Sequence, residues 1–319
     1  MKKSKKSLNL QNMISDELEP SGPEHGIVRM SEISRSSLGF VDSFPDGSPF
    51  FTWVEFSVTD LCNRTCVFCP RFDPKMYPDN NEEISLDLYE KIMNDLAESC
   101  WQGGIVFSAF GEPLLHRNLV GLVALTKRYL PDSNLDIVTN GDKLTAEKCL
   151  ELYSAGLDTL KVSLYDGPEQ IPIFEELRRQ IGIAEKRFVL RHRYDAEKNY
   201  GLIMSNRGGS VTSPDITLRD VELPLKHKCF FPFYMLVIDY DGRVLLCSHD
   251  WKKSFIVGDL KKQTIQEVWT GERMNVIREK LRNKDRNFAP CISCDVYGTL
   301  SGDKEFSRYN NLLSGNKNN

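Results

Sequence analysis

Short apolar stretches alternate with amphipathic stretches over the first two thirds of the chain. The strand-like stretches occupy 53–58, 104–113, 135–141, 159–167, 187–194 and 201–209. Between them, Ser85 and Thr145 are placed to cap two helices, and a third helix is expected near 118–129. Repeated strand–helix units of this kind predict a parallel sheet, in which functional residues follow the carboxyl ends of the strands.

The last third of the chain has a different pattern, with two apolar runs on either side of Asp241-Gly242. This dipeptide is a strong turn signal, so 233–247 is predicted to form a two-stranded ribbon. Thr264 and Glu267 then form a capping box that opens a helix, whose apolar residues could pack on the ribbon. The pattern therefore predicts a parallel α/β unit followed by a small hairpin–helix lobe.

Composition narrows the class of protein. At 319 residues and 40% apolar content, the chain can bury one substantial core. A net charge of −4 gives no electrostatic footprint for nucleic acid, so no nucleic-acid partner is expected. No apolar run approaches the roughly 18 residues of a membrane helix, and the N-terminus lacks a signal peptide. We therefore expect a cytoplasmic protein, in which the nine cysteines bind metal or act in catalysis rather than form disulfides.

Three of the cysteines, Cys62, Cys66 and Cys69, form a C-x3-C-x2-C run directly after the first predicted strand. A structural zinc site needs four protein ligands, and no fourth Cys or His lies nearby in the sequence. A [4Fe–4S] cluster held by three thiolates keeps one iron open to another ligand. The spacing therefore favours an iron–sulfur site with an open iron.

Four more cysteines, Cys229, Cys247, Cys291 and Cys294, lie in and after the predicted ribbon. Four thiolates can close a second [4Fe–4S] cluster, and they can also hold a structural zinc ion. The two remaining cysteines are expected away from the strand ends. Cys100 follows the first helix at the opposite end of the sheet, and Cys149 has the spacing of a buried helix residue.

The cysteine run resembles the signature of radical S-adenosylmethionine (SAM) enzymes, and the aromatic Phe68 before its third cysteine fits that family. The resemblance implies a partial (β/α)6 barrel of the TIM type. It also implies that SAM binds the open iron and is cleaved reductively to a 5′-deoxyadenosyl radical, with a flavodoxin or ferredoxin as the reductant.

The same resemblance implies which residues contact SAM. Gly111, Glu112 and Pro113 match the motif that holds the SAM amino group, and Thr139, Asn140 and Ser163 match positions near SAM and its ribose. Arg191 and Arg193 share one face of the fifth strand, and either could bind the SAM carboxylate. Arg207, at the predicted end of the sixth strand, could bind the substrate or help take up its proton.

The lobe resembles the twitch version of the SPASM extension, which carries one auxiliary cluster. Twitch-bearing dehydrogenases of this superfamily oxidise an aminocyclitol, so the resemblance implies dehydrogenation of a hydroxylated sugar or aminocyclitol with the auxiliary cluster as electron acceptor. Epimerisation is an alternative that needs a free thiol near the substrate, and modification of a peptide substrate is another. A non-catalytic electron-transfer or scaffold protein is the alternative outside enzymes.

The expected organisation has four parts. Residues 1–48 form a polar N-terminal segment, 49–215 the partial barrel, 216–298 the auxiliary-cluster domain and 299–319 a mobile tail.

Overall fold

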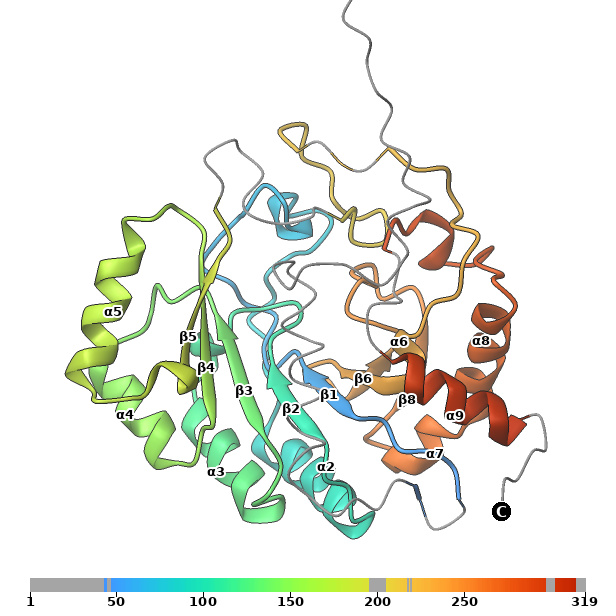
Figure 1. The fold of residues 1–319 in the computed structure, drawn as a ribbon, viewed down its shortest axis with the longest axis horizontal. Coiled ribbons are helices and arrows are strands. Elements are labelled where there is room, and N and C mark those ends of the chain that lie inside the picture. The colour runs from blue at the N-terminus through green and yellow to red at the C-terminus, as the bar shows by residue number, and fades with distance from the viewer. Residues whose placement is uncertain are drawn as a thin grey trace, which may run out of the picture.

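A single eight-stranded sheet organises the molecule (Figure 1). The structure, a computed structural model, describes residues 43–44, 47–194, 205–216, 218, 220–296 and 302–313. The strands are β1 (Trp53–Phe56), β2 (Gly104–Phe107), β3 (Leu135–Thr139), β4 (Thr159–Leu164), β5 (Phe188–His192), β6 (Met235–Ile238), β7 (Arg243–Leu245) and β8 (Ile256–Asp259). They lie in the order β5-β4-β3-β2-β1-β6-β7-β8, in which β5 to β6 are parallel and β7 and β8 antiparallel.

Helices follow most of the parallel strands and line the outside of the sheet (Figure 1). They are α2 (Leu86–Glu98), α3 (Leu119–Tyr129), α4 (Ala146–Ser154), α5 (Gln170–Gln180), α6 (Phe231–Tyr234), α7 (Ile265–Trp269), α8 (Glu272–Arg282) and α9 (Asp303–Leu313). Short 3-10 turns occupy Pro70–Phe72, Pro113–Leu115, Glu185–Arg187 and Cys291–Ser293. Among the described residues, no helix is both long enough and apolar enough to cross a bilayer.

The predicted helix caps are confirmed. The Ser85 hydroxyl accepts a hydrogen bond from the amide of Leu88, and the Thr145 hydroxyl accepts one from the amide of Lys148. Each satisfies one of the amides that a helix leaves unpaired in its first turn. Thr264 and Glu267 form the expected capping box at the start of α7.

The two faces of the parallel sheet differ sharply because successive side chains of a strand point to opposite faces. The outer face is apolar and packs against α2, α3 and α4 through residues such as Phe56, Phe107 and Ile137. The inner face is mixed: polar and charged residues such as Glu55 and Asp136 alternate with apolar ones such as Val106 and Val237, which belong to a second apolar cluster. The sheet therefore has its main core outside and a more polar face inside.

The predicted sixth strand at 201–209 is wrong in part and untested in part. Residues 201–204 lie outside the described residues, and 207–210 form a turn rather than a strand. The sixth parallel strand is β6, which comes from the predicted ribbon and pairs with β1, Glu55 opposite Val237. The ribbon was recognisable by its turn, but its pairing with a strand about 180 residues earlier has no local signal.

The C-terminal lobe therefore continues the barrel sheet. Strand β6 turns through Asp241-Gly242 into β7, as predicted, and β8 then adds an edge strand that the sequence analysis did not recognise. Helix α7 covers the lobe with Ile265, Val268 and Trp269, all buried.

The expectation of a mobile tail is wrong for its middle part. Helix α9 has an amphipathic pattern, and its Phe306 and Tyr309 are buried. Phe306 lies against Phe233 with ring centroids 4.8 Å apart, and Tyr309 donates a hydrogen bond from its hydroxyl to the carbonyl of Pro49. The N-terminal segment also reaches the core, because Phe44 is 2% exposed.

We expect Phe306→Ala to destabilise the fold by about 3–5 kcal/mol, the usual cost of removing a buried phenylalanine. The ring packs against Phe230 and Phe233, with ring centroids 4.6 Å and 4.8 Å apart. Ser307→Ala on the exposed side of α9 is the matched control. Equal melting temperatures for the two variants would show that α9 does not stabilise the lobe.

Candidate active site

The loop after β1 carries Cys62, Cys66 and Cys69, all half-buried. Arg71 fixes this loop from within: its guanidinium is 5% exposed and donates to the carbonyls of Asp60 (2.5 Å) and Phe110 (3.3 Å). Burial raises the pKa of the Cys66 thiol to about 12. The loop thus holds three thiols in a fixed, poorly hydrated place, where a metal would be needed to deprotonate them.

Acidic residues after β3 and β4 hold the same loop. The Arg64 guanidinium donates to Asp142 (Nε to Oδ2, 2.7 Å) and to Asp166 (Nη1 to Oδ1, 2.7 Å). Asn140 donates from Nδ2 to Oδ1 of Asn63 at 2.9 Å. The sequence analysis did not recognise these contacts, although an acidic residue shortly after each of two neighbouring strands was a usable signal.

The loop after β2 packs directly on the cysteine loop. The amide of Glu112 donates to the carbonyl of Leu61 at 2.7 Å. A Cβ added to Gly111 would lie 2.1 Å from the carbonyl oxygen of Thr59. Only glycine permits this approach, so Gly111 sets the position of Glu112 beside the cysteines.

The Glu112 carboxylate accepts hydrogen bonds from two of the other predicted site residues. It is 3% exposed and accepts from the Thr139 hydroxyl (2.6 Å), the Asn140 amide (2.8 Å) and the Leu114 amide (3.1 Å). Burial raises its pKa to about 6 despite these bonds. A carboxylate has about four acceptor positions, so one remains for a ligand amine. The structure therefore brings together Glu112, Thr139 and Asn140, and the buried Pro113 follows them as the first residue of a 3-10 turn.

Aromatic contacts connect the cysteine loop to the end of β4. Phe68 lies against Tyr165 with ring centroids 5.3 Å apart, and Tyr165 lies near the Ser163 side chain. Burial raises the pKa of Tyr165, so its hydroxyl stays protonated. Tyr165 was also missed, although it lies two residues beyond Ser163 and hence on the same face.

The predicted arginines lie near one another, but in different kinds of segment. Arg191 is opposite Ser163 in the β4–β5 register, and Arg193 follows on the same face, 8% exposed. Arg207 does not end a strand, which corrects the prediction. It lies in a turn with a φ of 48°, and it acts electrostatically on Arg191, Arg193 and Cys69.

The lobe gathers its four cysteines in a second apolar cluster, with side chains such as Trp251, Ile277 and Leu281 around them. Cys229, Cys247, Cys291 and Cys294 are all buried. Burial raises the pKa of Cys247 well above its ordinary value, and the other three cysteines raise it further.

This set of four soft thiol donors in an apolar shell fits an iron–sulfur cluster. Among the described residues, no three His, Cys, Asp or Glu side chains gather closely enough to bind a single ion. A cube does not require that, since each thiolate binds a different iron.

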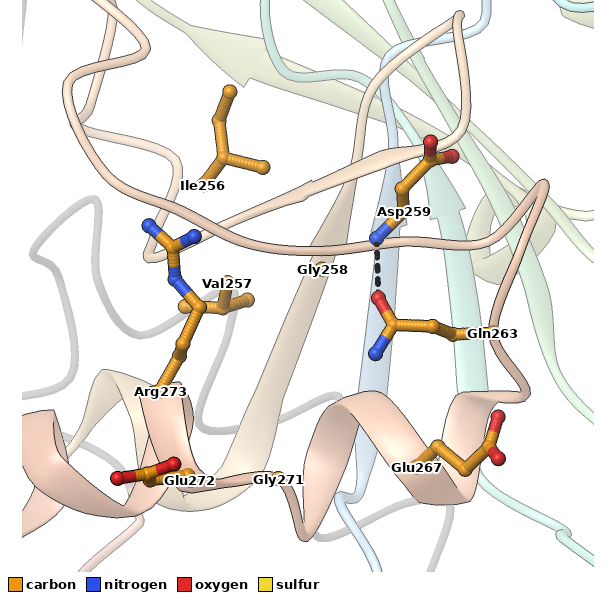
Figure 2. Close-up of a pocket in the computed structure, with 9 residues that line it drawn as sticks. All are labelled: Ile256, Val257, Gly258, Asp259, Gln263, Glu267, Gly271, Glu272 and Arg273. Carbon is orange, nitrogen blue, oxygen red and sulfur yellow. Dashed lines mark hydrogen bonds between the residues drawn. The ribbon is translucent and has the colours of Figure 1, made fainter.

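A pocket lies elsewhere on the lobe, between β8, α7 and α8 (Figure 2). Its wall includes Gln263, whose Oε1 accepts from the amide of Asp259 at 3.0 Å. None of the predicted site residues lines it. The pocket is thus separate from the cysteine loop and from the strand ends.

Two family models match the chain, and together they cover more than half of it. The model described as the radical SAM superfamily matches residues 56–192, and the one described as an iron–sulfur cluster-binding domain, SPASM, matches residues 229–295.

The relatives include an S-adenosyl-L-methionine-dependent 2-deoxy-scyllo-inosamine dehydrogenase from Niallia circulans. It is 28% identical over 247 residues, which cover 77% of this chain and 93% of the relative. A GTP 3′,8-cyclase from Rhodopirellula baltica is 32% identical over 35% of this chain and 30% of its own length.

Among solved structures, that of BtrN in complex with AdoMet and 2-DOIA superposes with a TM-score of 0.67 and 27% identity. The match covers 80% of this chain and 98% of BtrN. The parallel sheet, the cysteine loop after its first strand and the cysteine-rich hairpin lobe thus agree with both family models. The chain is an enzyme of the radical SAM superfamily with a C-terminal SPASM iron–sulfur domain.

Proposed function

We propose that the protein dehydrogenates a hydroxylated small molecule, a sugar or an aminocyclitol, at a carbinol carbon. One observation carries the proposal: the similarity to the 2-deoxy-scyllo-inosamine dehydrogenase spans 93% of that enzyme and includes the lobe as well as the barrel. The structural match to BtrN has the same extent. A shared lobe matters because a dehydrogenation has to pass one electron on after the hydrogen is removed.

The cofactors in this proposal are SAM and two [4Fe–4S] clusters, with a flavodoxin or ferredoxin as reductant. Cys62, Cys66 and Cys69 would hold the cluster that binds SAM. Cys229, Cys247, Cys291 and Cys294 would hold the auxiliary cluster. When bound, these groups supply a 5′-deoxyadenosyl radical that abstracts hydrogen from a substrate C–H bond, and an acceptor for the remaining electron.

The chain's own residues bind and orient the reactants in this proposal. Glu112 accepts from the SAM amino group with its remaining acceptor position, while Thr139 and the Asn140 amide hold the carboxylate in place. Ser163 and Phe68 lie near Tyr165 at the end of β4 and would contact the nucleoside part. Residues 49–215 form the unit that holds SAM, and 216–298 the unit that holds the auxiliary cluster.

The placement of the cysteines supports dehydrogenation over epimerisation. All nine cysteines lie in described segments, and seven belong to the two proposed clusters. Cys100 is exposed between α2 and β2, at the amino end of that strand. Cys149 is fully buried in α4, in the core outside the sheet. Neither thiol is placed to return a hydrogen atom to a substrate radical at the carboxyl ends of the strands.

Glu112→Gln should weaken SAM binding by about 1–3 kcal/mol, the range for a lost hydrogen bond to a charged group. A glutamine amide cannot accept from both the Asn140 and Leu114 amides, because one of its ends is a donor. Since burial raises the pKa of Glu112 to about 6, the wild-type affinity should fall below pH 6, where the carboxylate gains a proton.

The measurement is SAM affinity of the reconstituted protein against pH, with the surface variant Glu176→Gln as control. Iron content should be unchanged in both variants. Equal affinities and equal pH profiles for wild type and Glu112→Gln would remove Glu112 from the SAM site.

The test of the function itself is the product formed by the reduced holoenzyme from 2-deoxy-scyllo-inosamine and other aminocyclitols or sugars. Dehydrogenation predicts a product lighter by two hydrogens, with no solvent deuterium at the oxidised carbon in heavy water. A product of unchanged mass in ordinary water that carries one deuterium at that carbon in heavy water would instead establish an epimerase.

A further inference from the structure

Asn140 connects the two parts of the proposed SAM site. Its backbone amide donates to Oε2 of Glu112 at 2.8 Å, and its side-chain Nδ2 donates to Oδ1 of Asn63 at 2.9 Å. Glu112 is the proposed acceptor for the SAM amino group, and Asn63 directly follows Cys62 in the cysteine loop. One residue thus holds the carboxylate through its backbone and the cysteine loop through its side chain.

The oxygen of Glu112 that Asn140 holds is the one that can still accept from a ligand. Oε1 already accepts from the Thr139 hydroxyl (2.6 Å) and the Leu114 amide (3.1 Å), which fills the two acceptor positions of one carboxylate oxygen. In the part of the chain that the structure describes, Oε2 accepts only from the Asn140 amide. The acceptor position that remains for an amine is therefore on Oε2, whose place depends on Asn140.

Both polar atoms of the Asn140 side chain are engaged within the protein. Oδ1 accepts from the Asp142 amide at 3.0 Å, while Nδ2 donates to Asn63, and the residue is 5% exposed. These bonds favour a positioning role over the direct contact with SAM that the sequence resemblance implies.

The Asn63 end of this connection is fixed as well. Asn63 donates from Nδ2 to Oδ2 of Asp142 at 2.6 Å, so Asn63, Asp142 and Asn140 close a ring of hydrogen bonds. The neighbouring Arg64 donates to Asp142 through Nε (2.7 Å) and Nη2 (2.5 Å). Because the Asn63 side chain is held at both of its polar atoms, it cannot turn away from Asn140 without breaking a second hydrogen bond.

The backbone next to Asn140 is equally constrained. Gly141 has a φ of 80°, and a Cβ there would lie 2.6 Å from Cζ of Phe174 and 2.8 Å from Cγ1 of Val162. Only glycine permits this bend against β4 and α5. The loop after β3 is thus fixed by packing, and the hydrogen bonds of Asn140 set the positions of Glu112 and Asn63 relative to it.

We propose that Asn140 is a positioning residue that fixes the separation between Glu112 and the cysteine loop, and thereby the geometry in which SAM is held. In the proposed site one amino group has to meet both the Glu112 carboxylate and the open iron, so their separation must suit a single ligand. A rigid connection meets this requirement before SAM arrives, which lowers the cost of ordering the site on binding. The inference rests on the SAM site of the proposed function and is independent of the reaction that follows.

The test compares Asn140→Ala, Asn63→Ala and the double variant as reconstituted holoenzymes. Either single change removes the bond between the two side chains, while the Asn140 backbone amide can still hold Glu112. The SAM dissociation constant should rise about three- to tenfold in each, the effect of one lost hydrogen bond. The double variant should bind SAM no more weakly than the single variant with the larger effect, because both changes break the same connection. Asn94→Ala on the exposed face of α2 is the matched control and should leave the constant unchanged.

A spectroscopic readout separates positioning from stability. The change that SAM causes in the electron paramagnetic resonance spectrum of the reduced protein reports the coordination of the open iron. At saturating SAM this difference spectrum should be altered in Asn140→Ala and Asn63→Ala and unchanged in Asn94→Ala, with equal iron content in all. Asn63 is exposed, so its variant keeps the test decisive if Asn140→Ala fails to fold.

Three results would overturn the proposal, each for a different reason. Wild-type affinity and a wild-type difference spectrum in both single variants, even with a lower melting temperature, would mean that the connection only stabilises the fold. Weaker SAM binding in Asn140→Ala but not in Asn63→Ala would mean that Asn140 contacts SAM directly. If SAM changes neither the spectrum nor the melting temperature of the wild type, the proposed SAM site itself is wrong, and the inference fails with it.

Discussion

Replacing Cys62, Cys66 and Cys69 together by alanine should reduce the iron content from about eight to about four per chain and abolish SAM cleavage. The three thiols are the only cysteines in the loop after β1, and Arg71 and Arg64 hold that loop through contacts that do not involve them. The loop should therefore keep its shape while it loses its metal ligands. Iron and zinc analysis after anaerobic reconstitution, with an assay for 5′-deoxyadenosine, measures both effects.

The double variant Cys100→Ala with Cys149→Ala is the matched control for lost cysteines. Neither thiol lies in the two proposed cluster sites, so eight irons and turnover should remain, with a small loss of stability from packing at Cys149. A wild-type content of about four irons and one zinc per chain would mean that the lobe binds zinc.

The second large effect concerns the lobe. Cys291→Ala should abolish the oxidised product, while 5′-deoxyadenosine still forms in a first turnover. The reason is that Cys291 supplies one of four thiolates, and without the closed auxiliary site the substrate radical has no electron acceptor. The SAM site lies on separate segments, so hydrogen abstraction should survive.

Single-turnover measurement of deoxyadenosine and of oxidised product separates the two steps. The control is the same cysteine double variant, in which both should form in equal amounts. Oxidised product at the wild-type level from Cys291→Ala would mean that the lobe plays only a structural part.

Much of the site was predictable because its chemistry is encoded locally. The spacing of Cys62, Cys66 and Cys69 is short-range, and so is the strand-end position of Glu112. The same holds for the five strands from β1 to β5 and for the helix caps, which depend on residues within one or two turns. These signals can be read from the sequence without knowledge of the rest of the fold.

The features that were missed depend on contacts between distant segments. Arg64 meets Asp166 across 102 residues, and Asn206 meets Asp295 across 89. Nothing in the local pattern of 205–210 distinguishes a strand end from a turn pressed against the lobe. Helix α9 was mistaken for a mobile tail because its polar composition outweighed two apolar residues, Phe306 and Tyr309, that find partners only in the folded lobe.

Because β6 pairs with β1, the barrel and the lobe share one sheet and cannot be separated without breaking it. A chain cut before residue 229 would lose β6 and leave the inner edge of β1 with unpaired amides and carbonyls, which invite association with other chains. The lobe therefore cannot be exchanged between barrels by cutting and rejoining the chain at a linker. Any chimaera would have to be joined through the sheet, and the separation between the two proposed clusters would be inherited from the hydrogen-bonded register of Trp53–Phe56 against Met235–Ile238.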